Sequence, residues 1–215
     1  MSYAIQPRSR VKRLPERASY DKEVIYQILD EALICHVGFV VENQPFVIPT
    51  IHARRDDTLL LHGATVSRLL KHLQAGNPIC VETTLLDGLV VARGVFHNSM
   101  NYRSVVLFGR GRLLTRAEEK YEALHVLTDR VFPGRWDDSR LPSAKELKGT
   151  SIIVLDIESA SAKMRAGGPK DDAADYAGAW WAGVIPTEQK FLAPVKDEKL
   201  RAGIATPRYL KKYTR

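Results

Sequence analysis

Apolar residues recur along this chain at two spacings, and each spacing predicts a different kind of element. Steps of three and four residues predict amphipathic helices, as at Ile25, Ile28 and Leu29. Short apolar runs rich in β-branched residues predict strands. On this basis we expect helices at 21–33, 66–75 and 115–131, with a short one at 143–148. We expect strands at 34–41, 45–54, 58–62, 79–86, 89–96, 105–114 and 150–157, the last continuing toward Met164.

The predicted strands follow one another mainly through short turns. Glu42 to Gln44 is the expected turn of the first hairpin, and Asp87-Gly88 is the typical signature of a tight second one. Pro49 cannot donate a backbone hydrogen bond, so it predicts a bulge or a sheet edge. Strands in hairpin order with few crossovers favour an antiparallel arrangement. The predicted fold class is therefore mainly β, a β-barrel with peripheral helices.

The composition along the chain predicts three regions. Residues 1–18 are charged and interrupted by prolines, which is typical of an N-terminal arm. Residues 19–165 contain the strands and helices named above. The Gly167-Gly168-Pro169 stretch then marks a change of character. We expect 166–215 to be a C-terminal extension that packs on the barrel.

Charge and cysteine usage limit the choice of partners. The 215 residues carry a formal net charge of +7, but the basic residues gather at the two ends and not in one patch. We therefore expect no nucleic-acid partner. Cys35 and Cys80 each lie in an apolar run, which is typical of reduced core cysteines. No apolar run approaches the roughly 18 residues of a membrane span. A cytoplasmic protein without a membrane partner is the expectation.

The segment 58–77 contains the strongest candidate for a binding site. A strand ends at His62-Gly63-Ala64, and a helix follows, with Ser67 and Arg68 near its start. Backbone N–H groups, a hydroxyl and a cation at such a junction suit a phosphate. The same residues also fit an ordinary strand–turn–helix in which Thr65 is the N-cap. Both interpretations stay open on the sequence alone.

The sequence contains no recognised motif for a metal site or for nucleophilic catalysis. The six histidines form no HxxxH or HExxH motif, and no CxxC is present, so no metal site is expected. A haem held by one histidine stays open. No GxSxG nucleophile motif occurs, and the catalytic residues stay unknown. The polar stretch 97–104 is expected to be a binding loop. Trp180 and Trp181 either close over a flat ligand or bury against a partner, or one of them fills a hydrophobic gap within the chain.

Three segments in fixed order carry a family resemblance. They are FVIPTIHAR, then LLLHGATVSRLLKHL followed by NPICVE, then NYRSVVLFGRGRLL before a helix. Over about residues 10–190 this order resembles the pyridoxamine 5′-phosphate oxidase-like, FMN-binding split-barrel proteins. It is most similar to the flavin-nucleotide-binding branch that includes the nitroimidazole-resistance reductases.

The resemblance implies an FMN-binding split β-barrel that forms a homodimer with FMN at the interface. In such proteins the strand-to-helix segment holds the phosphate, the hairpin strand borders the isoalloxazine ring, and a third strand contributes from either subunit. The cofactor-binding positions implied here are Ile48, Pro49, Thr50, Ile51, His62, Gly63, Ala64, Ser67, Arg68, Arg103, Ser104, Val105 and Trp181. Many relatives carry a lysine where this chain has Leu69, which leaves the phosphate charge to Arg68 or to a more distant base.

The resemblance also implies a function. We expect an FMN-dependent oxidoreductase that acts on an unidentified small molecule, with NADH or NADPH as a candidate donor. Vitamin B6 oxidation itself is not expected, because the paired substrate-binding arginine and histidine of that oxidase are missing. The alternative is a non-catalytic flavin- or haem-binding module for storage or sensing. A bound flavin supplies the redox chemistry, which agrees with the lack of a catalytic motif.

Overall fold

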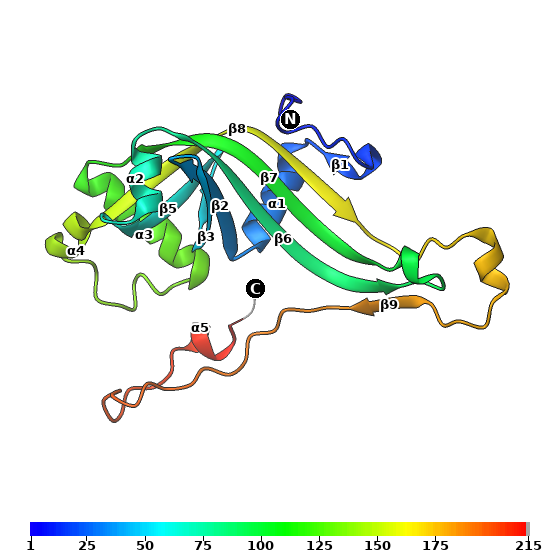
Figure 1. Ribbon diagram of the computed structural model, residues 1–215. Helices are drawn as coiled ribbons and strands as arrows, with labels where there is room; N and C mark the ends of the chain where they lie inside the picture. Colours follow the sequence, from blue (N-terminus) through cyan, green and yellow to red (C-terminus); the bar gives the residue numbers. More distant parts are fainter. Residues whose placement is uncertain (214–215) are drawn as a thin grey trace.

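One antiparallel sheet of nine strands dominates the computed structural model, which describes residues 1–213 (Figure 1). The strands are β1 Ala18–Ser19, β2 Ile34–Val41, β3 Gln44–Ile51, β4 Ala53–Arg55, β5 Thr58–Ala64, β6 Pro78–Val91, β7 Ser99–Leu113, β8 Thr150–Arg165 and β9 Gly183–Pro186. The α-helices are α1 Lys22–Glu31, α2 Arg68–Gln74, α3 Ala117–Val131, α4 Ala144–Gly149 and α5 Arg208–Lys211. Short 3-10 helices lie at Pro15–Arg17, Val95–His97 and Ala173–Ala177.

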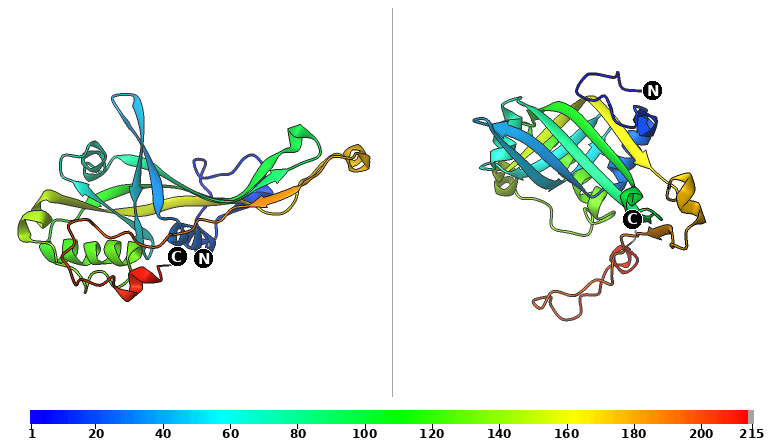
Figure 2. Two further views of the ribbon diagram at one scale, coloured as in Figure 1. Left: turned by 90° about the horizontal axis from the view of Figure 1, so that it is seen from below. Right: turned by 45° about the vertical axis from the view of Figure 1, so that its right-hand side comes forward.

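The sheet order is β3-β2-β6-β7-β8-β5-β4, with β1 added to β8 and β9 added to β6. All of these pairings are antiparallel, and the sheet curls so that β3 approaches β5 (Figure 2). The predicted mainly β fold with peripheral helices is therefore confirmed. No helix in the described part of the chain is long and apolar enough to cross a membrane.

The first hairpin follows the prediction closely. β2 pairs with β3 from Ile34–Ile51 to Val41–Gln44. Glu42 and Asn43 both have positive φ, 50° and 61°, as a two-residue turn with the twist of a hairpin requires. β3 ends the main strand order, so Pro49 lies on an edge strand where its missing N–H costs little.

The predicted tight turn at Asp87-Gly88 is wrong. β6 runs straight through it to Val91, with only a register shift between Leu86 and Gly88. Gly88 is needed for another reason: a Cβ there would lie 2.9 Å from the backbone oxygen of Ile185 in β9. Gly88 thus permits the close approach of β9. In the sequence, a glycine needed for this reason looks the same as a glycine needed for a turn. The loop expected at 97–104 is likewise mostly strand, because β7 begins at Ser99.

Two apolar clusters fill the two faces of the curled sheet. The larger lies inside the barrel and includes residues from α1 and α2, such as Leu29 and Leu73. The smaller lies outside, where α3 covers β4, β5 and β8 through residues such as Leu127 and Val154. Cys35 is fully buried in the first cluster, and this burial raises the pKa of its thiol to about 12. Such a thiol is unreactive at neutral pH.

Side chains satisfy backbone groups at both ends of α1. Its N-cap is Asp21, whose carboxylate accepts from the Glu23 N–H. At the other end, Arg130 of α3 donates to the carbonyl oxygens of Leu29 and Ala32. These carbonyls belong to the last turn of α1, where a cation is favourable. The contact fixes α1 against α3.

The long strands continue beyond the barrel as what we call the β extension, residues 86–102 and 163–186. Figure 1 shows β6, β7 and β8 curving away from the helices to a narrow tip, with β9 returning along β6. Beyond β9 the chain runs back beneath the barrel (Figure 1), and Tyr213 donates to the Val131 carbonyl at the end of α3. At the N-terminal side Tyr3 is buried against α1, and Arg8 pairs with Glu158 of β8.

Candidate functional site

The β5–α2 junction is open to solvent at its centre. Ala64, Thr65 and Val66 are exposed, and the Thr65 backbone N–H donates to the Gly149 carbonyl. The N-cap of α2 is Ser67, whose hydroxyl accepts from the Leu70 N–H, and not Thr65. Ser67 therefore has a structural role, and its hydroxyl hydrogen remains available to a ligand.

Arg68 begins α2 and lies over the ring of Phe46 in β3, with 4.4 Å between Cζ and the ring centroid. Among the residues that the structure describes, no carboxylate pairs with Arg68 and no hydrogen bond is formed by its guanidinium. The side chain is exposed. A positioned arginine with free donors is suited to bind a phosphate.

His62, near the end of β5, has a buried Nδ1 without any hydrogen-bond partner in the described chain. Burial lowers the pKa of this imidazole below its ordinary value, so the neutral form prevails at pH 7. An unpartnered buried polar atom costs free energy unless a ligand or water satisfies it. His62 thus fits the predicted role beside a bound cofactor.

The four β3 positions divide by the alternation of the strand. Ile48 packs against the barrel core, whereas Pro49 and Ile51 face solvent. Thr50 is half-buried and donates to the Ile51 carbonyl at 3.3 Å. Only one face of this edge strand is therefore open to a ligand.

The three β7 positions are already engaged within the chain. Arg103 donates to both carboxylate oxygens of Glu31 and to both of Asp87, which raises the pKa of the guanidinium. Ser104 donates to the Lys163 carbonyl, and Val105 is fully buried in the barrel core. Trp181, just before β9, is 66% exposed and lies against Gly183.

Within one chain these sets lie far apart. His62 pairs with Ile152 of β8, whereas Val105 pairs with Ala162 of the same strand. The two β8 residues are ten positions apart, which is roughly 30 Å of extended chain. Trp181 lies still farther out, because Gly183 pairs with Val91 at the far end of β6. The structure therefore brings His62, Ser67 and Arg68 together and leaves the β7 residues and Trp181 apart from them. The β3 positions lie level with β7, since Thr50 pairs with Cys35 of β2, and β2 runs beside the β6 segment that pairs with Val105.

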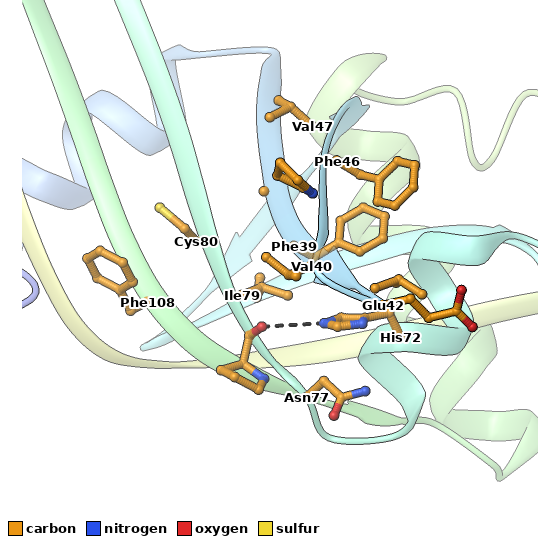
Figure 3. Close-up of a pocket in the computed structure, with 14 residues that line it drawn as sticks. Phe39, Val40, Glu42, Phe46, Val47, His72, Asn77, Ile79, Cys80 and Phe108 are labelled. Atoms are coloured by element: carbon orange, nitrogen blue, oxygen red, sulfur yellow. Dashed lines mark hydrogen bonds between the residues drawn. The ribbon is translucent and has the colours of Figure 1, made fainter.

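A separate apolar pocket of about 730 Å³ lies beside α2 and was not predicted (Figure 3). Three phenylalanines line it: Phe39 from β2, Phe46 from β3 and Phe108 from β7. His72 of α2 also faces it, with its ring centroid 5.0 Å from that of Phe39. The pocket is large enough for a drug-sized or tetrapyrrole-sized ligand.

The hydrogen bonding of His72 fits a ligating role. Its Nε2 lies 3.4 Å from the Pro78 carbonyl oxygen, which favours the tautomer with the proton on Nε2. Nδ1 then keeps its lone pair, the arrangement found in metal-binding histidines whose second nitrogen donates to a backbone carbonyl. No local signal in the sequence reveals this pocket, because its walls come from elements far apart along the chain.

A comparison with protein-family models matches residues 21–164 to the family described as pyridoxamine 5′-phosphate oxidase. The matched segment runs from the cap of α1 almost to the end of β8 and includes β2 to β7 in full. The chain belongs to this family. The family predicted from the three sequence segments is thereby confirmed. No curated protein sequence matched the chain.

Two solved structures resemble the chain over nearly its whole length. The flavocytochrome Anf3 from Azotobacter vinelandii is 39% identical, with a TM-score of 0.91 and 97% of each chain covered. The FAD and haem binding protein from Mycobacterium smegmatis is 35% identical, with a TM-score of 0.86, 90% of this chain and 95% of that one covered. A 5-nitroimidazole antibiotic resistance protein from Bacteroides thetaiotaomicron shares the fold at 24% identity, with a TM-score of 0.58, 68% of this chain and 85% of that one covered.

Proposed function

We propose that this chain binds a flavin and a haem and acts as an oxidoreductase that moves electrons between them. The observation that carries the proposal is the apolar, phenylalanine-lined pocket with a histidine, found in a chain similar over nearly its full length to a flavocytochrome and to an FAD and haem binding protein. A flavin supplies hydride and single-electron chemistry, and a haem supplies single-electron chemistry.

The flavin phosphate belongs at the β5–α2 junction. Arg68 offers a guanidinium with free donors, Ser67 a hydroxyl, and His62 an unpartnered ring nitrogen. These three groups lie within seven residues, as a compact anion requires. Leu69 is buried in the barrel core and supplies no charge, so Arg68 is the principal cation of the junction.

The flavin is FAD in this proposal, whereas the family resemblance seen in the sequence implies FMN. The Mycobacterium smegmatis relative, at 35% identity, binds FAD, and this supports the larger cofactor. Acid release of the flavin followed by chromatography separates the two. A preparation that releases only FMN would restore the expectation from the sequence and contradict this part of the proposal.

A homodimer with the flavin at its interface accounts for the separation of the predicted residues. One flavin cannot contact both His62 and Val105 of the same chain across roughly 30 Å of strand. In a symmetric dimer, one subunit supplies the β5–α2 junction and its partner supplies residues of β7 or Trp181. In such a dimer the partner subunit would bury the exposed apolar residues of the β extension. These residues are Leu86, Leu89, Val95, Phe96, Met100, Trp180, Trp181 and Ile185.

A haem would be held in the pocket of Figure 3, where His72 would supply a nitrogen ligand to its iron. Phe39, Phe46 and Phe108 provide apolar walls for the macrocycle, and the Pro78 carbonyl orients the imidazole. Phe46 also contacts Arg68, so the two proposed cofactor sites share one side chain. Such contiguity is favourable for electron transfer between two redox groups.

The absorption spectrum of freshly purified protein tests the proposal. We expect a flavin band at about 450 nm together with a haem Soret band. A protein that stays colourless after incubation with FAD, FMN and haem would contradict it. Anaerobic mixing with NADH or NADPH then separates an enzyme, whose flavin band bleaches, from a non-catalytic binding module, whose band persists.

A further inference from the structure

The tip of the β extension joins two segments that are far apart in the sequence. The 3-10 helix Val95–His97 connects β6 to β7, and Asp172 precedes the 3-10 helix Ala173–Ala177 between β8 and β9. The Nε2 atom of His97 lies 3.4 Å from Oδ2 of Asp172. One carboxylate oxygen of Asp175 joins them, and the three donor atoms all lie within 4.8 Å of one another.

This spacing is close to what a bound cation requires. Zinc binds imidazole nitrogen and carboxylate oxygen at about 2.0–2.2 Å, so two ligand atoms of a tetrahedral site lie roughly 3.3–3.6 Å apart. The His97–Asp172 separation already has this value. A small closing movement of the Asp175 carboxylate completes a set of three protein donors.

At the tip of the β extension, the two segments are held together by a different acidic residue, Asp171. The buried carboxylate of Asp171 accepts from the backbone N–H groups of Arg93 and Gly94, at 2.8 and 3.1 Å. The same carboxylate pairs with the Arg93 guanidinium at 3.2 Å. Arg93 is therefore neutralised by Asp171, and the charges of Asp172 and Asp175 remain for a cation. A Cβ at Gly94 would lie 3.2 Å from both Asp175 Oδ2 and His97 Cδ2, so the site packs closely against the turn.

We propose that His97, Asp172 and Asp175 form a binding site for a divalent transition-metal ion, with Zn²⁺ as the best match. A nitrogen donor favours Zn²⁺ over Mg²⁺ and Ca²⁺, which prefer oxygen ligands. Two carboxylates balance the charge of the ion, and water fills the remaining position. The bound ion ties the β6–β7 turn to the β8–β9 connection and stiffens the tip that carries Trp180 and Trp181.

Calorimetric titration with ZnCl₂ tests the site on the full-length protein, freed of its purification tag and treated with a chelator. We expect one Zn²⁺ per chain. His97→Ala and Asp175→Asn should each weaken Zn²⁺ binding at least about tenfold, since even the loss of an outer-shell partner costs 10–100-fold. Mg²⁺ at the same concentration should give no comparable heat.

A matched control exists within the chain. His125 Nε2 and Asp129 Oδ2 also lie 3.4 Å apart on α3, but they belong to no cluster of three such donors in the described residues. The double variant His125→Ala/Asp129→Asn should retain full affinity. Absence of Zn²⁺ binding, or binding that survives in His97→Ala and Asp175→Asn, overturns the proposal. Loss confined to the α3 control also overturns it.

Hydrogen exchange provides a second readout that locates the ion. Zn²⁺ should slow exchange in peptides covering 92–98 and 170–178 and leave peptides of α3 unchanged. Equal or absent protection in both regions contradicts the assignment. The flavin and haem content of the same samples is measured alongside, so a failure of the metal site is distinguishable from a failure of the proposed cofactor function.

Discussion

Arg68 lies over the ring of Phe46, with its guanidinium carbon 4.4 Å from the ring centroid. The contact joins the first residue of α2 to β3, the two elements predicted to border the same cofactor. It orients the guanidinium without using its hydrogen-bond donors, because the aromatic face attracts the cation as a whole. The donors remain available to an anion.

Replacing Arg68 by alanine is expected to weaken flavin binding. A charged hydrogen bond contributes about 1.5–3 kcal/mol, so the dissociation constant should rise by that equivalent. Fluorescence titration of the flavin-free protein with FAD and with FMN measures the change. Arg116→Ala is the control. That side chain is 70% exposed, and its Nε lies 3.9 Å from Oε2 of Glu118, so it already has a carboxylate partner. Unchanged affinity in the Arg68 variant would remove this residue from the site.

Replacing His72 by alanine is expected to abolish the Soret band while leaving the flavin band in place. The variant loses the nitrogen that would bind the haem iron, whereas the β5–α2 junction is untouched. Absorption spectra of the purified variant, with the flavin band as internal reference, measure the effect. His125→Ala, which removes a ring stacked on Trp136 outside the pocket, should keep its haem. A normal Soret band in the His72 variant would contradict the assignment and make His62 the next candidate for the haem ligand.

A mixed dimer tests whether each flavin site draws on both subunits. We expect Arg68→Ala and Trp181→Ala homodimers to bind flavin weakly at both sites. A heterodimer of the two variants carries both substitutions in one site and none in the other, so it should recover about half of the sites at full affinity. Two differently tagged chains permit its purification. In the control, Trp180→Ala takes the place of Trp181→Ala. If neither site of the Arg68→Ala/Trp181→Ala heterodimer regains flavin affinity, Arg68 and Trp181 of the same chain belong to one site.

Stability is expected to fall as the pH drops below about 6.5, the ordinary pKa of histidine. Burial lowers the pKa of His52, which is 1% exposed, and of His62. Above both the unfolded and folded pKa neither state is protonated, and stability does not depend on these groups. Below the unfolded pKa the unfolded chain binds protons that the folded chain excludes, so each histidine costs up to about 1.4 kcal/mol per pH unit.

Urea unfolding between pH 7.5 and 5.5 measures this dependence. His52→Gln should reduce the slope, because glutamine does not titrate and can still donate to the Leu29 carbonyl that Nε2 of His52 contacts at 2.9 Å. His125→Gln, at an exposed position, is the control. An identical slope in wild type and His52→Gln would show that His52 does not contribute.

Gly109→Ala is expected to destabilise the barrel. A Cβ at this position would lie 2.0 Å from the Asp156 carbonyl oxygen, at the register shift between β7 and β8. Strands must move apart to admit it, and overpacking of this kind costs about 1–3 kcal/mol or more. Urea unfolding measures the loss. Gly149→Ala, where a Cβ meets nothing within 4 Å, should change stability far less.

Local patterns in the sequence were sufficient for most elements. The apolar run at 34–41 became β2, Glu42-Asn43 became the hairpin turn, and the helix expected at 115–131 became α3. Each of these elements depends on residues that are close neighbours along the chain, so a short stretch of sequence is enough to predict it. Gly88 was misassigned because its cause, the approach of Ile185, lies almost a hundred residues away.

The same division holds for the candidate sites. His62, Ser67 and Arg68 could be picked out from the chain because one strand end and one helix start place them together. The pocket of Phe39, His72 and Phe108 and the cluster of His97, Asp172 and Asp175 could not, since curling of the sheet and pairing of its long strands bring their members together. Short-range order follows from backbone preferences and periodicity, whereas these sites depend on long-range strand pairing, for which no single segment carries the information.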